Sequence, residues 1–421
     1  YDYADFAILY RTNAQSRILE EALRKRGIPY KIYGGLSFYQ RKEVKDVISY
    51  LRLIVNPHDE EAFKRVINYP ARGIGDTTLN KLVVAATDHN VSLWTVLNDP
   101  IGYALPVNNG TAKKLSDFRE LISGFIERNV KLSAEEIAAA VVKESGIVST
   151  LFQDRSVEGI SKQENLQELL KGIAEFCEIR REEGTEHVSL ADFLSEVSLL
   201  TDQDNDKEEQ ANKVTMMTVH AAKGLEFRNV FVVGLEEDLF PSAMSKDNPR
   251  AVEEERRLFY VAITRAEENC VLTHARSRYR NGQSTMCSPS RFLKDIDPKY
   301  IYTSADAVTT NGLLATRRSS VFQQPKAMEG EAYVSPVAQA VGRQARLTRM
   351  ETASLSSAPS SSSAPALSGL HVGAKVRHDR FGEGEVTAIE GEGGNAKATV
   401  SFAHFGQKQL LLKFARLTIV E

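Results

Sequence analysis

The chain has 421 residues, of which 42% are hydrophobic and 26% are charged, which excludes a disordered or collagen-like polypeptide and leaves room for two or three domains. Its formal net charge is −3, so no overall basic field indicates a nucleic-acid partner, and any phosphate contact must come from a local site. The three cysteines lack metal-ligand spacing, and no apolar run approaches the ~20 residues that span a bilayer. We therefore expect a cytoplasmic protein with no metal site, no disulfide scaffold and no membrane contact.

The opening segment predicts a strand, a turn and a helix. Residues 6–10 form a short apolar run, and apolar residues then recur at helical spacing from Ile18 to Leu23. Gly27 is predicted to end this helix, because glycine readily adopts the left-handed conformation of a helix terminus. The chain begins at Tyr1, without a methionine and directly ahead of the apolar run, so we expect a piece of a larger protein.

A long helical block follows. From about residue 41 to residue 204 almost every apolar cluster has helical spacing, and the block ends in a polar, acidic stretch at 201–209. The pattern beyond it predicts strands at 214–219 and 229–235, a helix at 253–265 and a strand at 270–274. We therefore expect one α/β domain, residues 1–37 plus 213–300, interrupted by an all-α accessory domain, residues 38–212.

The last part of the chain has a different composition. Residues 301–368 lack periodicity and include a serine-rich run at 356–363, so they are predicted to be a flexible linker. Residues 369–421 then contain five short strand-like runs separated by glycine turns, at 375–377, 385–389, 398–402, 409–412 and 417–420. This spacing predicts a small β-barrel.

Two long runs carry the strongest functional signal. Residues 218–227 read TVHAAKGLEF and precede the apolar run VFVV, and residues 254–266 read EERRLFYVAITRA. Taken singly, the first could be a polar turn between strands and the second an amphipathic, salt-bridged helix. At this order and spacing they resemble the fifth and sixth motifs of the UvrD/PcrA/Rep family of superfamily 1 DNA helicases.

The resemblance covers essentially the whole chain and implies the carboxy-terminal half of such an enzyme: an α/β RecA-like motor domain (2A), the helical insertion (2B) and a Tudor-like barrel. In this family two motor domains close on ATP and magnesium. Arg265 matches the arginine that reaches the γ-phosphate, where a permanently charged guanidinium follows the charge on the transferring phosphoryl group. Glu226 matches the nucleotide-contacting glutamate, and the same run places Gly224 beside it.

A phosphate loop is missing from the chain. No G-x-x-x-x-G-K-[ST] run occurs, so no loop of backbone amides with a lysine holds the β- and γ-phosphates. The resemblance implies that ATP and magnesium are bound mainly by an amino-terminal motor domain outside this sequence. We therefore do not expect this chain alone to hydrolyse ATP.

A candidate site for single-stranded DNA follows the first predicted strand. Thr12 and Gln15 have the spacing of a capping box at the head of a helix, where free amides, Arg11 and Asn13 can converge on a phosphate. Local spacing by itself favours a plain capped helix. The resemblance favours DNA contact, because matching arginine and asparagine residues contact the strand in the family.

Two more residues are candidate contacts to single-stranded DNA because of the family resemblance. His220 matches a residue near the DNA backbone, although an isolated histidine is more often structural. Tyr279, within the basic run at 276–280, is a candidate base-stacking aromatic, but the spacing around it departs slightly from that of the family.

A candidate duplex contact lies in the helical block. Arg72, Gly73, Ile74 and Gly75 form a turn in which two glycines allow backbone amides to approach a phosphate. Such a run is more often only a turn, yet in the family it touches the duplex ahead of the fork. A second family-like run, KQENLQEL at 162–169, is assigned to packing.

The terminal segment resembles the Tudor-like barrel of UvrD and PcrA through residues 372–378 and 381–384. The resemblance implies RNA polymerase as a partner of residues 369–421, while a plain structural cap is the competing interpretation. A flexible tether would let such a barrel find a partner independently of the motor.

We thus expect an ATP-dependent DNA helicase of a bacterial nucleoid, acting in repair or replication; its 3′ to 5′ direction is implied by the resemblance alone. One alternative is a non-catalytic DNA- or RNA-polymerase-binding protein, which the gene sequence upstream of Tyr1 would discriminate. Another alternative is the motor of a RecB/AddA-type helicase-nuclease. The argument against it is that this sequence ends in the predicted barrel, with no downstream nuclease segment rich in Asp, Glu and Lys.

Overall fold

The computed structural model describes residues 1–204, 212–280, 283–302, 370–378, 381–391, 396–402, 406–415 and 417–420. The chain divides into two compact units, Tyr1–Ile296 with Leu370–Glu421, and Asp297–Gly369. The predicted linker falls almost wholly outside the described residues, and the predicted domain boundaries stay predictions.

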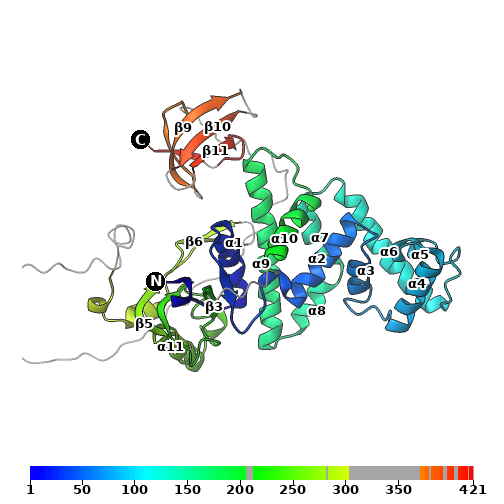
Figure 1. The fold of residues 1–421 in the computed structure, drawn as a ribbon, viewed down its shortest axis with the longest axis horizontal. Coiled ribbons are helices and arrows are strands. Elements are labelled where there is room, and N and C mark those ends of the chain that lie inside the picture. Colours follow the sequence, from blue (N-terminus) through cyan, green and yellow to red (C-terminus); the bar gives the residue numbers. More distant parts are fainter. Residues whose placement is uncertain are drawn as a thin grey trace, which may run out of the picture. The chain divides into compact units, whose positions relative to one another are not determined.

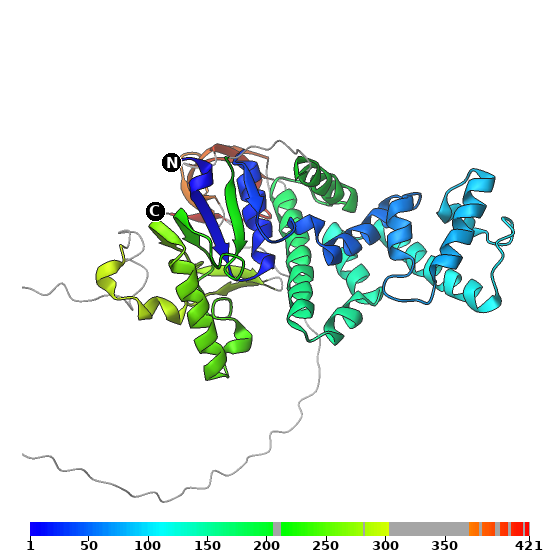
Figure 2. The same ribbon diagram turned by 60° about the horizontal axis from the view of Figure 1, so that its bottom comes forward.

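A five-stranded parallel sheet forms the centre of the α/β part. Its strands are β1 (Phe6–Tyr10), β2 (Tyr30–Ile32), β3 (Val214–Thr218), β4 (Phe227–Val232) and β5 (Ala266–Leu272), in the order β2-β3-β1-β4-β5 (Figure 2). The sheet therefore combines strands from both sides of the helical block, with β1 at its centre. This arrangement, with helices α1 (Ser16–Lys25) and α11 (Pro249–Ile263), fits the predicted α/β RecA-like fold.

Alternation along β1 shows how the sheet is packed. Ala7 and Leu9 are fully buried, whereas Phe6 and Ile8 are half-buried, as expected when successive side chains point to opposite faces. Phe259 and Ala262 of α11 belong to the same core cluster as Ala7 and Leu9. Helix α11 is thereby held against the sheet by apolar burial, which positions both of its ends.

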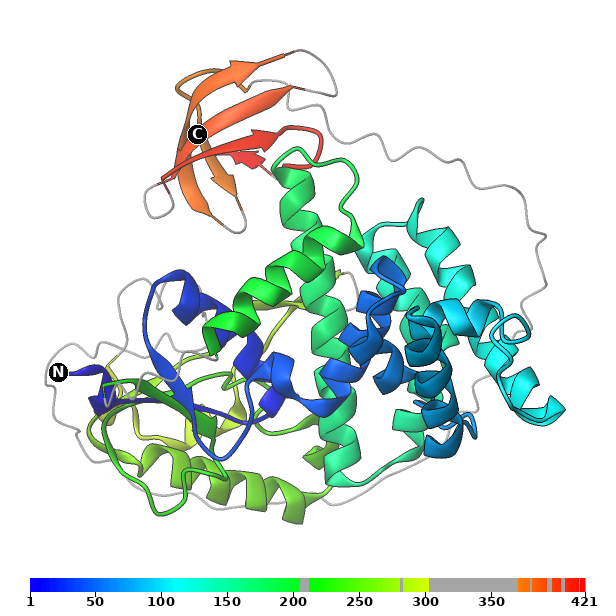
Figure 3. The ribbon, with the colours of Figure 1, turned by 45° about the vertical axis from the view of Figure 1, so that its right-hand side comes forward.

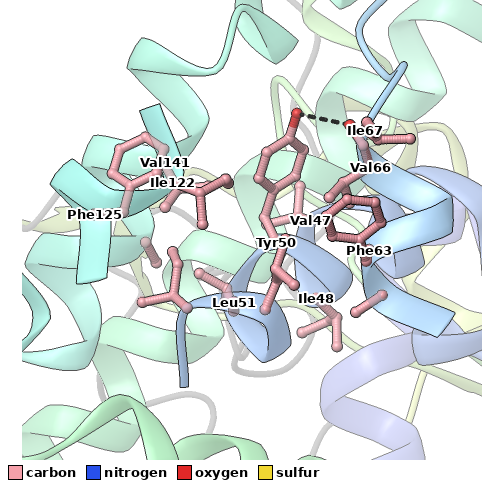
Figure 4. Packing of buried hydrophobic residues seen from close by; sticks show 14 of the residues in the cluster. Val47, Ile48, Tyr50, Leu51, Phe63, Val66, Ile67, Ile122, Phe125 and Val141 are labelled. Atoms are coloured by element: carbon pink, nitrogen blue, oxygen red, sulfur yellow. Dashed lines mark hydrogen bonds between the residues drawn. The ribbon is translucent and has the colours of Figure 1, made fainter. Parts of the chain in front are cut away.

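Nine helices fill the described part of the insertion (Figures 1 and 3). They are α2 (Lys42–Val55), α3 (Glu60–Val66), α4 (Asp76–His89), α5 (Leu93–Asn98), α6 (Asn109–Asn129), α7 (Ala134–Glu144), α8 (Ile147–Gln153), α9 (Val157–Glu182) and α10 (Leu190–Asp204). Their apolar faces meet in a core around α2, where Tyr50 packs among Val47, Phe63 and Ile122 and donates to the Val66 carbonyl (Figure 4). For the described residues of this block, the predicted all-α character is confirmed.

The predicted boundaries of α11, β4 and β5 in the α/β part were wrong, and β4 spans Phe227–Val232 instead of residues 229–235. Helix α11 begins at Pro249, four residues before the prediction, because Asn248 caps it and proline is favoured at the first helical position. Strand β5 begins at Ala266 rather than at residue 270. It is an edge strand with mostly exposed side chains, so its sequence lacks the apolar pattern of a buried strand.

The remaining elements are short. Strand β6 (Ser277–Arg280) pairs antiparallel with β7 (Gln283–Met286). Within the described residues the 3₁₀ turns are η1 (Tyr3–Asp5), η2 (Asn13–Gln15), η3 (Phe38–Gln40), η4 (Ala243–Ser245), η5 (Arg291–Asp295) and η6 (Pro298–Tyr300). Across the described residues no helix is long and apolar enough to cross a membrane. The same residues contain no cluster of side chains suited to a metal ion.

The terminal segment folds into a five-stranded antiparallel sheet. It contains β8 (Lys375–His378), β9 (Gly382–Glu390), β10 (Lys397–Phe402), β11 (Gly406–Leu411) and β12 (Leu417–Ile419), in the order β11-β10-β9-β8-β12. The five predicted strands are all present. No ladder joins β11 to β12 within the described residues, so closure of this sheet into a barrel stays a prediction.

Candidate nucleic-acid and nucleotide sites

The candidate residues of the α/β part lie at two opposite edges of the parallel sheet. Arg11 directly follows β1 and His220 closely follows β3, and these neighbouring strands pair in parallel up to Tyr10 and Thr218. Glu226 and Arg265 directly precede β4 and β5, which also pair in parallel. Because parallel strands end at the same edge, the first pair marks the carboxyl edge and the second the amino edge.

Two segments connect these edges. Residues 219–226 leave the end of β3 and return to the start of β4, so they carry His220 at one edge and Glu226 at the other. Helix α11 carries Glu255 near the carboxyl edge, against Arg11, and ends just before Arg265 at the amino edge. From Glu255 to the end of α11 the helix rises about 12 Å.

The Arg11 side chain is held by a buried carboxylate. Glu255 accepts from Arg11 Nε at 2.9 Å and from Nη2 at 2.5 Å, with side chains that are 8% and 21% exposed respectively. Such paired contacts fix the plane of a guanidinium as well as its position. Sequence reasoning missed Glu255, because a charged residue in an amphipathic helix gives no sign of a partner so distant in the chain.

The predicted capping box is present at the head of the turn before α1. Gln15 Oε1 accepts from the backbone N–H of Thr12 and of Arg11, at 2.9 Å in both cases. The capped segment is the 3₁₀ turn η2, from which α1 continues at Ser16. This box fixes the backbone on either side of Arg11 and Asn13.

Residues of the helical insertion also hydrogen-bond to the segment that contains Arg11 and Asn13. Arg41 is 7% exposed and donates from Nη1 to the Asn13 carbonyl at 2.7 Å and to Asn165 Oδ1 at 2.8 Å. Asn165 in turn donates to Glu43 at 2.6 Å. Asn165 belongs to the run at 162–169 that was assigned to packing, so the structure adds a polar anchoring role to that run.

His220 is an exposed residue close to Arg11 and Glu255. Partial burial of the imidazole, and then the charge of Arg11, hold the pKa of His220 below its usual value, while Glu255 opposes that shift. The imidazole should therefore gain its charge in more acidic solution than an ordinary histidine does. Tyr279 lies on β6, but its side chain is outside the described residues.

Gly224, Glu226 and Arg265 are brought together at the amino edge. Gly224 has φ +85°, a left-handed conformation that favours glycine, and a side chain there would meet open space. Glu226 is exposed. The Arg265 guanidinium donates from Nη1 to the Leu225 carbonyl at 2.8 Å and from Nε to the Val261 carbonyl at 3.1 Å.

The position of Arg265 matters because an interior guanidinium could not face a nucleotide. Arg265 is half-buried, and its Nη2 contacts the exposed Thr264 hydroxyl at 3.1 Å. The side chain thus rests on backbone carbonyls next to Glu226, at the surface of the amino edge. A phosphate could replace these carbonyls as acceptors, because charged acceptors bind a guanidinium more strongly.

The four residues of the predicted duplex contact fall into two groups. The Arg72 guanidinium faces the protein, where it donates to the Tyr69 carbonyl at 2.9 Å, to the Tyr50 hydroxyl at 2.7 Å and to the Ser145 carbonyl at 3.0 Å. Ile74 is 2% exposed. Both side chains shape the turn from inside.

Gly73 and Gly75 are the exposed members of that run. Gly73 has φ +71°, which favours glycine, and Gly75 precedes α4, where a Cβ would meet open space. Lys114 of α6 donates to the Gly73 carbonyl at 3.1 Å and adds a positive charge beside the turn. Lys114 was not predicted, since it lies on another helix of the insertion.

The structure thus contains an α/β part with a helical insertion. Its candidate contacts to a nucleotide and to single-stranded DNA lie at opposite edges of one sheet. The family model "UvrD-like helicase C-terminal domain" matches residues 1–277, and that of the "PcrA/UvrD tudor domain" matches residues 372–418. The chain belongs to the UvrD-like helicase family.

Relatives over the whole chain carry helicase names. The chain is 36% identical to "ATP-dependent DNA helicase PcrA" of Staphylococcus epidermidis strain RP62A and 36% identical to "DNA helicase II" of Escherichia coli K12, in each case over 99% of this chain and 52% of the relative. It is 38% identical to the PcrA helicase of Staphylococcus aureus NCTC 8325, over 98% of this chain and 52% of the relative. The chain thus spans about half the length of the curated relatives it matches.

Proposed function

We propose that this chain is the carboxy-terminal half of an ATP-dependent DNA helicase that moves 3′ to 5′ along single-stranded DNA in repair or replication. The observation that carries the proposal is that Arg11 and His220 lie at one edge of the sheet and Glu226 and Arg265 at the opposite edge, with α11 and residues 219–226 joining the two edges. Family membership supports it. ATP with magnesium would be held mainly by a second motor domain, with this chain supplying Arg265, Gly224 and Glu226.

The chemistry of the two edges suggests how hydrolysis moves the strand. A γ-phosphate presented at the amino edge would draw Arg265 away from the Leu225 and Val261 carbonyls and favour a closed pair of domains. Loss of that phosphate would favour the open pair. During opening and closing, the single-stranded DNA would be held by Arg11, Asn13 and His220, and Tyr279 would stack on a base.

The proposal is tested with the full-length protein and with the 421-residue chain. We expect the full-length protein to unwind a duplex with a 3′ single-stranded tail when ATP and magnesium are present. The chain alone should bind a labelled oligonucleotide without hydrolysing ATP. Full-length protein that hydrolyses no ATP in the presence of DNA would favour the non-catalytic alternative.

We predict that protonation of His220 strengthens strand binding. Because the pKa of His220 is lowered, the increase in affinity should come below histidine's ordinary value of ~6.5. Fluorescence anisotropy of a labelled oligonucleotide, measured from about pH 7.5 to about pH 5, detects it. The His220→Gln variant should lack this rise, and an identical pH response in that variant would remove His220 from the strand site.

We also propose that the turn at 72–75 contacts a duplex through the exposed backbone of Gly73 and Gly75, with Arg72 and Ile74 shaping the turn. Lys114→Gln should then lower the affinity for a duplex. It should also make that affinity less dependent on salt, with the negative slope of log K against log salt becoming smaller in magnitude by about 0.9. Lys113→Gln, an exposed neighbour on α6, is the matched control. Equal losses in both variants would indicate only a general charge effect.

For the terminal sheet we propose closure into a small Tudor-like barrel that contacts RNA polymerase. The match of residues 372–418 to the tudor family model supports the barrel. The polymerase contact rests on the family resemblance, and co-purification of purified polymerase with full-length protein, but not with protein lacking residues 369–421, would support it.

A further inference from the structure

Glu255 and Arg11 form the most tightly organised ion pair at the carboxyl edge. The carboxylate accepts from Nε of Arg11 with both oxygens, at 3.2 and 2.9 Å, and from Nη2 at 2.5 Å. The two residues are 244 positions apart in the chain, on α11 and just after β1. Their contact is therefore a product of the tertiary fold and not of helix spacing.

Burial makes this geometry rigid. The Glu255 side chain is 8% exposed, and a carboxylate with so little water around it requires a charged partner. Phe259 and Ala262, one and two turns further along α11, are packed in the core of the α/β part. Because packing fixes this part of α11, the Glu255 carboxylate has little freedom to move. The ion pair therefore fixes the Arg11 guanidinium beside it.

The hold leaves one side of the guanidinium available. Nε and Nη2 are directed at Glu255, whereas Nη1 makes no hydrogen bond to any of the described residues. Arg11 is 21% exposed, and His220, the second candidate strand residue, is near enough for the charge of Arg11 to act on it. Arg11 also lies near the half-buried Glu164 of α9, whose pKa is raised by burial and lowered in part by the charge of Arg11. A phosphate that binds Nη1 would not have to displace Glu255, which is bound to Nε and Nη2.

We propose that Glu255 is a positioning residue of the single-strand site, which orients Arg11 so that Nη1 faces the DNA phosphate. The inference rests on the proposed function and deepens it, since it assigns a role to a residue of α11 that does not itself touch DNA. A competing role is that Glu255 masks Arg11 and is displaced by the phosphate. The two roles predict opposite changes in affinity when Glu255 is removed.

The test is a double-mutant cycle in the 421-residue chain, with binding of a labelled single-stranded oligonucleotide as the measurement. We expect Arg11→Ala and Glu255→Ala each to weaken binding by about tenfold, as for loss of one charge-assisted contact. Glu255 also acts on the pKa of His220, so binding is measured at about pH 8, where the imidazole is neutral with or without Glu255. At that pH the double variant should bind no more weakly than Arg11→Ala, because the remaining effect of Glu255 is through Arg11. Arg11→Ala and Glu255→Ala should each also lower the salt slope by about 0.7.

Two further variants separate positioning from folding. Glu254→Gln is the matched control, since Glu254 is the preceding residue on α11 and pairs with the exposed Arg257; its affinity should equal that of the unmodified chain. Glu255→Gln has nearly the same size as glutamate, so it repeats the test if alanine destabilises the buried position. Glu255→Asp should restore part of the lost affinity.

The outcomes are distinguishable. An unmodified chain that fails to bind the oligonucleotide would overturn the proposed function, and the role of Glu255 with it. An unmodified chain that binds, with additive losses in the cycle, would overturn only the positioning role. Tighter binding by Glu255→Ala would do the same, by showing that Glu255 masks Arg11.

Discussion

Replacing Arg265 with alanine in the full-length protein is expected to lower DNA-stimulated ATP hydrolysis by ~10³-fold or more, while single-strand affinity changes little. The guanidinium lies at the amino edge of the sheet beside Glu226, whereas Arg11 and His220, the proposed contacts to single-stranded DNA, lie at the carboxyl edge. Loss of Arg265 should therefore remove stabilisation of the transferring phosphoryl group without touching the strand contacts. Steady-state ATPase assays with saturating oligonucleotide measure the first effect, and anisotropy measures the second.

Arg257→Ala is the matched control for this experiment, because Arg257 lies on α11, the helix that ends just before Arg265, and pairs only with the exposed Glu254 among the described residues. Arg265→Lys keeps a positive charge but loses the planar fork, so it should restore only a small part of the rate. Alanine also removes the donors to two backbone carbonyls, so melting curves of each variant accompany the assay. Turnover at the unmodified level in Arg265→Ala would exclude the proposed role.

Replacing Arg17 with methionine is expected to destabilise the packing between α1 and α9 by about 3 kcal/mol. Arg17 is 2% exposed and bridges Glu21 of α1 to Glu168 and Glu175 of α9, with Nη2 at 2.7 Å from each of the two α9 carboxylates. Methionine fills similar space but leaves three carboxylates close together without their shared cation. Partial exposure of these carboxylates limits the loss to the lower end of the range for broken buried pairs.

Urea unfolding of the 421-residue chain, combined with hydrogen exchange of α1 and α9, measures this loss. The exchange data matter because a chain with several cores need not unfold in one step. Arg26→Met is the matched control, since Arg26 is exposed just after α1 and donates only to the Ala22 carbonyl within the described residues. If both variants unfold at the same urea concentration as the unmodified chain, the cluster does not stabilise the contact.

Much of the architecture could be predicted from the sequence because it depends on local patterns. Apolar residues at helical spacing marked the insertion, and the runs at 218–227 and 254–266 indicated the family. The capping box of Thr12 and Gln15 was also readable, since both of its hydrogen bonds lie within four residues. Strand β5 was placed poorly, because an exposed edge strand carries little apolar pattern.

Only the tertiary structure decided which charged side chains face outward. Arg72 was predicted to contact DNA, and the fold binds its guanidinium to Tyr50 and to backbone carbonyls, whereas Lys114, on another helix, reaches the turn. Glu255 looked like an ordinary helix-surface charge but holds Arg11. The physical reason is that periodicity and capping act over a few residues, whereas an ion pair depends on positions that exist only once the sheet and its helices have packed.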